Sequence, residues 1–282
     1  MSLVKVASRP TVWVADPLPA VCEQWLKQEA RLVSEPGPNI AGLVVRTSTQ
    51  VDVALLDRLP HLRCVARAGV GVDHIDLGAC KKRSISVVNT PDANTESVVE
   101  YALGLMLDTV RPRDEIPVQG TMEAWESARQ HLTGGRRLAE YRIGILGFGR
   151  IGQRLGAVLH ALGADVAFHD IHVQSEMNPE AIRSMPREEL FSWSEILSVH
   201  IDGRAGNRGL IDGPLLDLLD PCAVVLNTSR GFVFNTLDLQ RWLERHPHAT
   251  AILDVHSEEP VPEDHPLRQL SNARLLPHLA SR

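Results

Sequence analysis

The sequence predicts an α/β protein made of two doubly wound parallel-sheet domains, Rossmann-like or flavodoxin-like, with a cleft between them. Three observations support this fold class. Short runs rich in β-branched residues alternate with longer helical patterns in both halves of the chain. A glycine-rich turn follows one of the apolar runs in the second half, and 282 residues are too many for a single nucleotide-binding unit.

Composition narrows the class of protein further. Hydrophobic residues make up 44% of the chain and charged residues 23%, which is the balance of an ordinary globular protein. The formal net charge of −6 argues against binding to nucleic acid or to an anionic membrane surface. The four cysteines contain no CxxC pair, so neither a metal site nor a disulfide framework is predicted. We expect a cytoplasmic protein without a membrane span.

The first half contains four predicted strands and one long helix. The strands are expected at residues 11–15, 41–46, 62–66 and 85–89. The helix is predicted over Thr95–Val110, with Asn94 as its cap and Arg111 and Pro112 as its end. The polar stretch 113–137 is interpreted as a connecting segment, so residues 1–108 are assigned to one domain and 109–282 to a second domain.

A second alternation of strands and helices begins near residue 141. A helix over residues 150–162 presents apolar side chains at helical spacing, which predicts that it packs on a sheet. The predicted strands of this half lie at 142–146, 165–169, 197–201, 223–227, 249–255 and 273–276.

The glycine-rich turn joins the first strand of the second half to its first helix. Gly147 permits a tight turn, Gly149 lets a pyrophosphate approach the backbone, and Gly152 allows close helix packing. Arg150 and Ile151 open the helix, whose free N–H groups and dipole favour a bound anion. The pattern predicts a dinucleotide site, although a glycine-rich turn in another kind of α/β nucleotide-binding protein would look similar.

An acidic residue ends the next predicted strand. Asp170 lies close to the expected distance of about 20 residues from the first glycine. A carboxylate there accepts hydrogen bonds from ribose hydroxyls and repels a 2′-phosphate. We therefore expect NAD rather than NADP as the cofactor.

Three residues with reactive side chains follow predicted strands near the C-terminus. His278 supplies a base, Arg230 supplies a cation for a carboxylate, and Glu259 supplies a second carboxylate. These are the residue types that oxidation of a hydroxy acid by a nicotinamide needs. Each of them, taken alone, is equally compatible with a solvated surface position.

The chain resembles the D-isomer-specific 2-hydroxyacid dehydrogenases over almost its whole length. The motifs that carry the resemblance are the glycine turn, the three C-terminal segments, and residues 67–76, 89–91 and 100–103. The resemblance implies that His278 is the general acid/base and that Glu259, which precedes a proline as the family's acid does, is its partner rather than Glu258. It also implies that Arg230 binds the substrate carboxylate.

Further residues take roles from the same resemblance. The backbone at Gly69, Val70 and Gly71 is expected to form a second cradle for the substrate carboxylate. Asp254 resembles the acid that orients the nicotinamide carboxamide, and Thr228 is assigned to the cofactor site.

Within the family, the sequence is most similar to the D-3-phosphoglycerate dehydrogenase branch. There, an arginine in the position of Arg46 lies near the substrate phosphate, although a surface arginine at a strand end is an equally simple interpretation. The expected substrate is a small D-2-hydroxy or 2-keto acid, with 3-phosphoglycerate or a similar doubly charged acid as the candidate. A homodimer is the default expectation, from the apolar band of the helix over Thr95–Val110 and from the family's habit.

Two departures from the family pattern keep another class of protein open. Asp202 and Gly203 stand where relatives commonly have a proline, and the sequence stops soon after His278, without the family's return segment to the first domain. The alternative is a catalytically weak or inactive NAD(H)-binding regulatory module with the same fold.

Overall fold

The computed structural model describes residues 9–46, 48–113, 120–132, 135–173 and 182–281. The chain divides into two compact units, Met1–Ala93 and Asn94–Arg282, and each is described here by itself. The sequence placed the domain boundary at residue 108, whereas this division places the whole helix α4 (Thr95–Val110) in the second unit.

The first unit contains a five-stranded sheet whose paired strands are all parallel, in the order β2-β1-β3-β4-β5. This order, 2-1-3-4-5, is that of flavodoxin-like folds. The strands are β1 (Thr11–Val14), β2 (Arg31–Val33), β3 (Gly42–Val45), β4 (Cys64–Arg67) and β5 (Ser86–Asn89). The short strand β2 was not predicted, because its three residues carry too little pattern.

The helices of the first unit are α1 (Ala20–Glu29), α2 (Val53–Asp57) and α3 (Leu77–Lys82). The short helices α2 and α3 begin at aspartates whose side chains accept a backbone N–H from the first turn, Asp52 from Leu55 and Asp76 from Ala79. Their apolar side chains join the buried core formed by β3 and β4.

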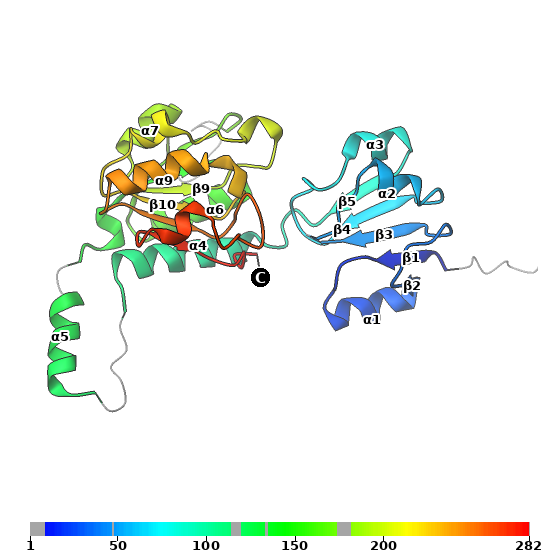
Figure 1. Cartoon of the computed structure of the whole chain (residues 1–282), viewed down its shortest axis with the longest axis horizontal. Helices are drawn as coiled ribbons and strands as arrows, with labels where there is room; N and C mark the ends of the chain where they lie inside the picture. Colours follow the sequence, from blue (N-terminus) through cyan, green and yellow to red (C-terminus); the bar gives the residue numbers. More distant parts are fainter. Residues whose placement is uncertain (1–8, 47, 114–119, 133–134, 174–181, 282) are drawn as a thin grey trace, which may run out of the picture. The chain divides into compact units, whose positions relative to one another are not determined.

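The second unit, coloured from green to red in Figure 1, contains a seven-stranded, all-parallel sheet. Its strand order is β12-β11-β10-β9-β6-β7-β8. Counted along the chain from β6, this is the Rossmann order 3-2-1-4-5-6 with one more strand, β12, at the edge. The strands are β6 (Arg142–Leu146), β7 (Asp165–His169), β8 (Arg183–Ser184), β9 (Ile196–Val199), β10 (Val224–Asn227), β11 (Thr250–Leu253) and β12 (Ala273–Leu275). The predicted fold class, two doubly wound parallel sheets, is confirmed.

Helices cover both faces of this sheet. Besides α4, the helices of the second unit are α5 (Met122–Leu132), α6 (Arg150–Ala161), α7 (Arg187–Trp193), α8 (Gly213–Leu216) and α9 (Thr236–Arg245), and all of these except α5 pack in the cores on the two faces. 3₁₀ turns lie at Leu138–Glu140, Ala205–Asn207, Gly231–Val233 and Pro266–Gln269. Alternate strand residues face opposite sides: Ile145 packs with α4 and α6, and Leu146 packs with α7, α8 and α9.

Helix α4 uses its apolar band inside the second unit. Its buried side chains are Val98, Val99, Ala102, Leu105, Met106 and Val110, and those from Val99 onward pack in one core with α6. The band on which the homodimer expectation rested is therefore largely occupied by intramolecular packing. Asn94 occupies the cap position as predicted, but within the described residues its side chain accepts no hydrogen bond from the first turn.

The stretch 113–137, interpreted from the sequence as a connecting segment, contains the helix α5, which was not predicted. The helix begins with an ordinary cap, in which the Thr121 hydroxyl accepts the N–H of Ala124. One turn later the Arg129 guanidinium lies 5.3 Å from the centre of the Trp125 ring. The stretch 113–137 has no clear apolar period, so apolar spacing did not predict this helix.

No helix among the described residues is long and apolar enough to cross a membrane. No group of histidine, cysteine and acidic side chains in the same part of the chain is arranged to hold a metal ion.

Helix α9 offers a matched test of the core. Leu239 is fully buried there, whereas Leu237 is 55% exposed. Leu239→Ala should lower the free energy of unfolding by about 2–5 kcal/mol through lost contacts and a cavity, and Leu237→Ala should change it by less than about 0.5 kcal/mol. Urea denaturation monitored by tryptophan fluorescence measures both, and equal effects would show that α9 does not pack as described.

Candidate functional site

The carboxyl ends of the strands in the second unit meet at one edge of its sheet, because all of them are parallel. In open α/β sheets this edge is where ligands bind, beside the strand pair at which the order reverses. Here that pair is β6 and β9. The sequence-predicted residues of the second unit follow β6, β7, β10, β11 and β12, so the fold brings all of their loops to this edge.

The turn after β6 is built on two glycines that no other residue could replace without movement. Gly147 has φ +93°, and a Cβ there would lie 2.7 Å from the carbonyl carbon and oxygen of His200. A Cβ on Gly152 would lie 2.2 Å from the carbonyl oxygen of Gly147. The absence of side chains at these two positions lets the start of α6 lie close to the turn.

Gly149 differs from both. It is the residue before α6, and no described heavy atom lies within 4 Å of the position its Cβ would take. The space in front of the first N–H groups of α6, which include those of Arg150 and Ile151, is therefore open. A helix N-terminus with open space before it suits a pyrophosphate.

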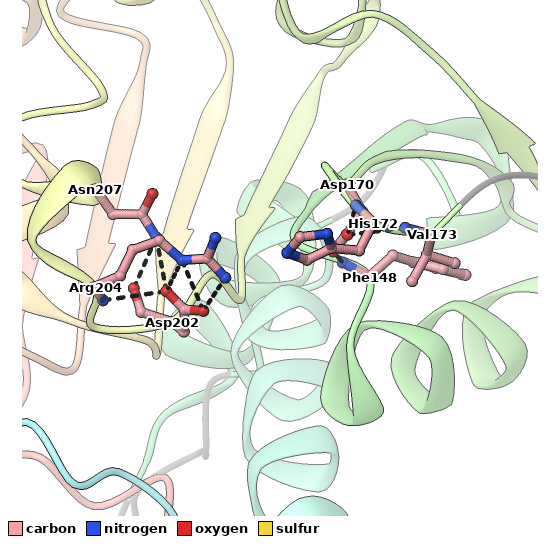
Figure 2. A network of polar contacts seen from close by, with 7 residues as sticks. All are labelled: Phe148, Asp170, His172, Val173, Asp202, Arg204 and Asn207. Carbon is pink, nitrogen blue, oxygen red and sulfur yellow. Dashed lines mark hydrogen bonds and ion pairs between the residues drawn. The ribbon is translucent and has the colours of Figure 1, made fainter. Parts of the chain in front are cut away.

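Asp170 is tied to this turn (Figure 2). Its Oδ2 accepts the N–H of Phe148 at 2.7 Å, and its Oδ1 accepts the N–H groups of His172 at 2.7 Å and Val173 at 3.1 Å. The Phe148 ring stacks on Phe168 with 3.8 Å between centroids. The predicted ribose-binding acid and the predicted pyrophosphate turn thus form one connected unit.

The loop after β9 carries a second network, drawn opposite Asp170 in Figure 2. Asp202 accepts hydrogen bonds from the Arg204 side chain at 2.5–3.0 Å and from the Asn207 amide at 3.0 Å. The hydrogen bond from Arg204 lowers the pKa of Asp202, and the charge of Arg230 lowers it further. Asp202 stands where relatives commonly have a proline, and its pairing with Arg204 was not predicted, because spacing alone does not reveal it.

The loop after β10 is shaped by Asn227, which is completely buried. Its Oδ1 accepts the N–H of Ser229 at 3.0 Å and the Ser229 hydroxyl at 2.8 Å, and its amide donates to the carbonyl of Arg230 at 2.9 Å. The Arg230 guanidinium in turn donates to the carbonyl of Ser229 at 2.8 Å. Asn227 therefore determines where Arg230 emerges, a role that the sequence analysis did not assign.

Thr228 leaves a polar atom to be satisfied. Its hydroxyl is buried and has no hydrogen-bond partner among the residues that the structure describes. Buried hydroxyls are rarely left in this state, so a ligand group is a fitting partner. Together with the open space at Gly149, this shows that the residues present fit a bound dinucleotide.

His278 and Glu259 meet although they follow different strands. The Nδ1 of His278 lies 2.8 Å from Oε2 of Glu259, while Oε1 of Glu259 accepts the N–H of His256 at 2.9 Å. The hydrogen bond to Glu259 raises the pKa of His278, in spite of burial. Burial raises the pKa of Glu259, but the hydrogen bonds from His278 and His256 outweigh it and the net shift is downward.

Asp254 is fully buried and accepts hydrogen bonds from the turn that follows His278. Its Oδ1 accepts the N–H of Leu279 at 2.9 Å and the Tyr101 hydroxyl at 3.3 Å, and its Oδ2 accepts the N–H of Ala280 at 2.8 Å. Tyr101 lies on α4, 153 residues before Asp254. Nothing in the local sequence signals this contact.

The remaining predicted residues belong to the first unit. Gly69 has φ +148° and carries no side chain where the Arg67 guanidinium lies, and the Asn89 amide donates to the carbonyl of Val70 at 2.7 Å. Gly71 continues the same loop after β4, and Arg46 directly follows β3. The backbone N–H of Arg46 donates to buried Asp16 at 2.5 Å, and its guanidinium donates to the carbonyl of Pro17 at 3.2 Å.

Comparison with known proteins places this fold and site in one family. Residues 103–280 match the model of the D-isomer specific 2-hydroxyacid dehydrogenase, NAD binding domain. The chain belongs to the D-isomer specific 2-hydroxyacid dehydrogenase family, and its second unit carries the family's NAD-binding domain.

Individual relatives show how far the likeness extends. The chain is 33% identical over 245 residues to D-3-phosphoglycerate dehydrogenase of Mycobacterium leprae, covering 86% of this chain but 46% of that protein. It is 34% identical over 263 residues to (S)-sulfolactate dehydrogenase of Chromohalobacter salexigens, covering 89% and 81%. The chain therefore spans about half the length of the phosphoglycerate dehydrogenases that it matches and most of the length of the sulfolactate enzyme.

A solved structure gives the same result for the fold. The NADPH-dependent glyoxylate/hydroxypyruvate reductase of Sinorhizobium meliloti, in complex with NADP and malonate, superposes with a TM-score of 0.80 at 28% identity. The match covers 97% of this chain and 88% of that one.

The same substitution should have opposite effects at Gly149 and Gly152, the two glycines at the start of α6. Gly149→Ala should leave the thermal midpoint nearly unchanged, because its Cβ has room, but should weaken NADH binding by about tenfold or more through intrusion on the pyrophosphate. Gly152→Ala should lower the thermal midpoint, because its Cβ would contact a backbone oxygen. Fluorescence titration with NADH and thermal denaturation separate the two, and normal NADH affinity in Gly149→Ala would contradict the placement of the pyrophosphate.

Proposed function

We propose that this protein is an NAD-dependent oxidoreductase that interconverts a small D-2-hydroxy acid and the corresponding 2-keto acid. One observation carries the proposal: the His278–Glu259 pair is formed in the same unit, and at the same edge of the sheet, as the glycine turn and Arg230. A proton-transferring group, a cation and a dinucleotide site are what this reaction requires.

In this proposal His278 transfers the proton. Its Nδ1 is engaged by Glu259, which leaves Nε2 to donate to the carbonyl oxygen of a keto acid or to accept the proton of a hydroxyl. Glu259 stabilises the protonated imidazole and fixes the orientation of the ring. Arg230, presented by Asn227, binds the substrate carboxylate and polarises the reacting oxygen with its planar guanidinium.

The residues proposed to hold the cofactor are Gly147, Gly149, Arg150, Ile151, Gly152, Asp170, Thr228 and Asp254. When bound, the nicotinamide supplies the hydride acceptor or donor. Asp170 favours NAD, because its charge would repel a 2′-phosphate, although a solved relative at 28% identity uses NADPH.

The substrate class is narrowed by charge. Both curated relatives described above are named for substrates with a second acidic group, a phosphate in one and a sulfonate in the other. Arg46 is proposed to bind such a group, and the loop Gly69–Val70–Gly71 to bind the carboxylate. A 2-keto acid with a second anionic group, such as 3-phosphohydroxypyruvate, is therefore the preferred substrate in this proposal.

The second candidate is a regulatory module that binds NAD(H) without turnover. The formed His278–Glu259 pair favours the enzyme, because cofactor sensing alone needs neither residue. A homodimer remains an expectation from the sequence and the family.

Turnover assays decide between the two candidates. NADH oxidation should be seen with at least one of 3-phosphohydroxypyruvate, sulfopyruvate, hydroxypyruvate and glyoxylate, and His278→Ala should lower kcat by roughly 10²–10⁴-fold at unchanged NADH affinity. His160→Ala, an exposed histidine on α6, is the control and should behave like the parent. NADH binding without turnover of any of these acids would refute the enzyme and leave the regulatory module.

The pH dependence tests the role of Glu259. Reduction of a keto acid needs protonated His278, so activity is present below the pKa of His278 and is lost as the pH rises through it. Because Glu259 raises that pKa, Glu259→Gln should move the falling limb of kcat to lower pH, by about one unit for each tenfold change in proton affinity. A limb at the parental pH would show that Glu259 does not support His278.

A further inference from the structure

We propose that Tyr101 and Asp254 together anchor the turn that carries His278, and that Tyr101 is a positioning residue for proton transfer. The role of Tyr101 in proton transfer rests on the function proposed above. The anchor itself is a structural feature that can be tested separately. It extends the site to a helix that none of the predicted functional residues occupies.

The carboxylate of Asp254 accepts hydrogen bonds from groups of the protein itself. It is completely buried, and its two oxygens accept three hydrogen bonds, two from the backbone of Leu279 and Ala280 and one from the Tyr101 hydroxyl. A buried carboxylate without such donors would be strongly unfavourable. The N–H groups of the turn and the carboxylate therefore stabilise each other.

The turn needs an anchor, because the backbone of His278 is in an unfavourable conformation. His278 has φ +56°, a left-handed value that residues other than glycine seldom adopt. Such a conformation persists when neighbouring contacts determine it, and it is found preferentially at functional sites. The two N–H groups that immediately follow His278 are the ones that Asp254 binds.

Tyr101 connects this turn to a different layer of the fold. Its ring packs against the core that α4 shares with α6, and its hydroxyl donates to the same Oδ1 that accepts the N–H of Leu279. Asp254 follows β11, so the carboxylate is held from the strand by its own backbone and from the helix by Tyr101. These two attachments restrict the position of the carboxylate. Through its hydrogen bonds to Leu279 and Ala280, the carboxylate in turn restricts the turn after His278.

Substitutions of Tyr101 and Asp254 should have different effects on His278, because only Asp254 contributes a charge near it. The charged groups that act on His278 are Glu259, Asp254 and Arg230. Removing the Tyr101 hydroxyl changes the geometry of the anchor and leaves these charges in place. Replacing Asp254 with asparagine removes a negative charge and also presents an NH₂ group to a backbone N–H.

The experiment compares Tyr101→Phe and Asp254→Asn in the full chain with two controls, Tyr141→Phe and Asp264→Asn. Tyr101→Phe should lower kcat by about tenfold with KM for NADH within about twofold of the parent. Asp254→Asn should lower kcat further and move the NMR titration of His278 to lower pH. Both variants should increase hydrogen exchange at the amides of Leu279 and Ala280, and the controls should do neither.

Two results would overturn the proposal. One is a Tyr101→Phe variant with parental kcat and parental amide exchange at Leu279 and Ala280. The other is an Asp254→Asn variant that binds NADH weakly but has parental kcat at saturating NADH, which would make Asp254 a cofactor ligand only. If the parent turns over no 2-keto acid, the proposed function fails, whereas the exchange and titration data still decide whether the anchor exists.

Discussion

Parallel pairing of the strands β6 to β12 is the constraint on which the candidate site depends. Because each strand runs in the same direction, every loop at its carboxyl end emerges at the same edge of the sheet. The glycine turn, Asp170, Arg230, Glu259 and His278 are distributed over more than 130 residues of sequence, yet each is on or beside one of these loops. One antiparallel strand in this series would have sent its loop to the opposite edge.

Buried and partly buried polar side chains then give these loops their shapes. Asn227 organises the loop of Arg230, Asp170 binds the N–H groups of the glycine turn and of its own loop, and Asp254 binds the turn after His278. In each case a side-chain oxygen accepts backbone N–H groups at the end of a strand, where the ladder of the sheet no longer satisfies them. The candidate site thus depends on side chains, such as Asn227, that are not proposed to take part in the reaction.

Close backbone contacts impose a second requirement at the same edge. Gly147 and Gly231 each lie where a Cβ would collide with the backbone of a neighbouring loop, at His200 and His256 respectively. The loops after β6 and β9, and those after β10 and β11, can approach each other only because these two positions lack side chains. The distance between the glycine turn and the loops that carry Arg230 and Glu259 depends on these close approaches at Gly147 and Gly231.

The sequence by itself determined what depends on local pattern. Apolar runs located most strands, and the order of glycines between β6 and α6 located the tight turn that joins them, because periodicity and backbone freedom are properties of neighbouring residues. The strands β2 and β8 and the helix α5 were missed because they are short or polar. The resemblance to the family implied the pairing of His278 with Glu259, but only the tertiary structure decided the contacts of Tyr101 with Asp254 and of Arg204 with Asp202. Such contacts depend on how strand order and loop length bring distant residues together, which no local pattern encodes.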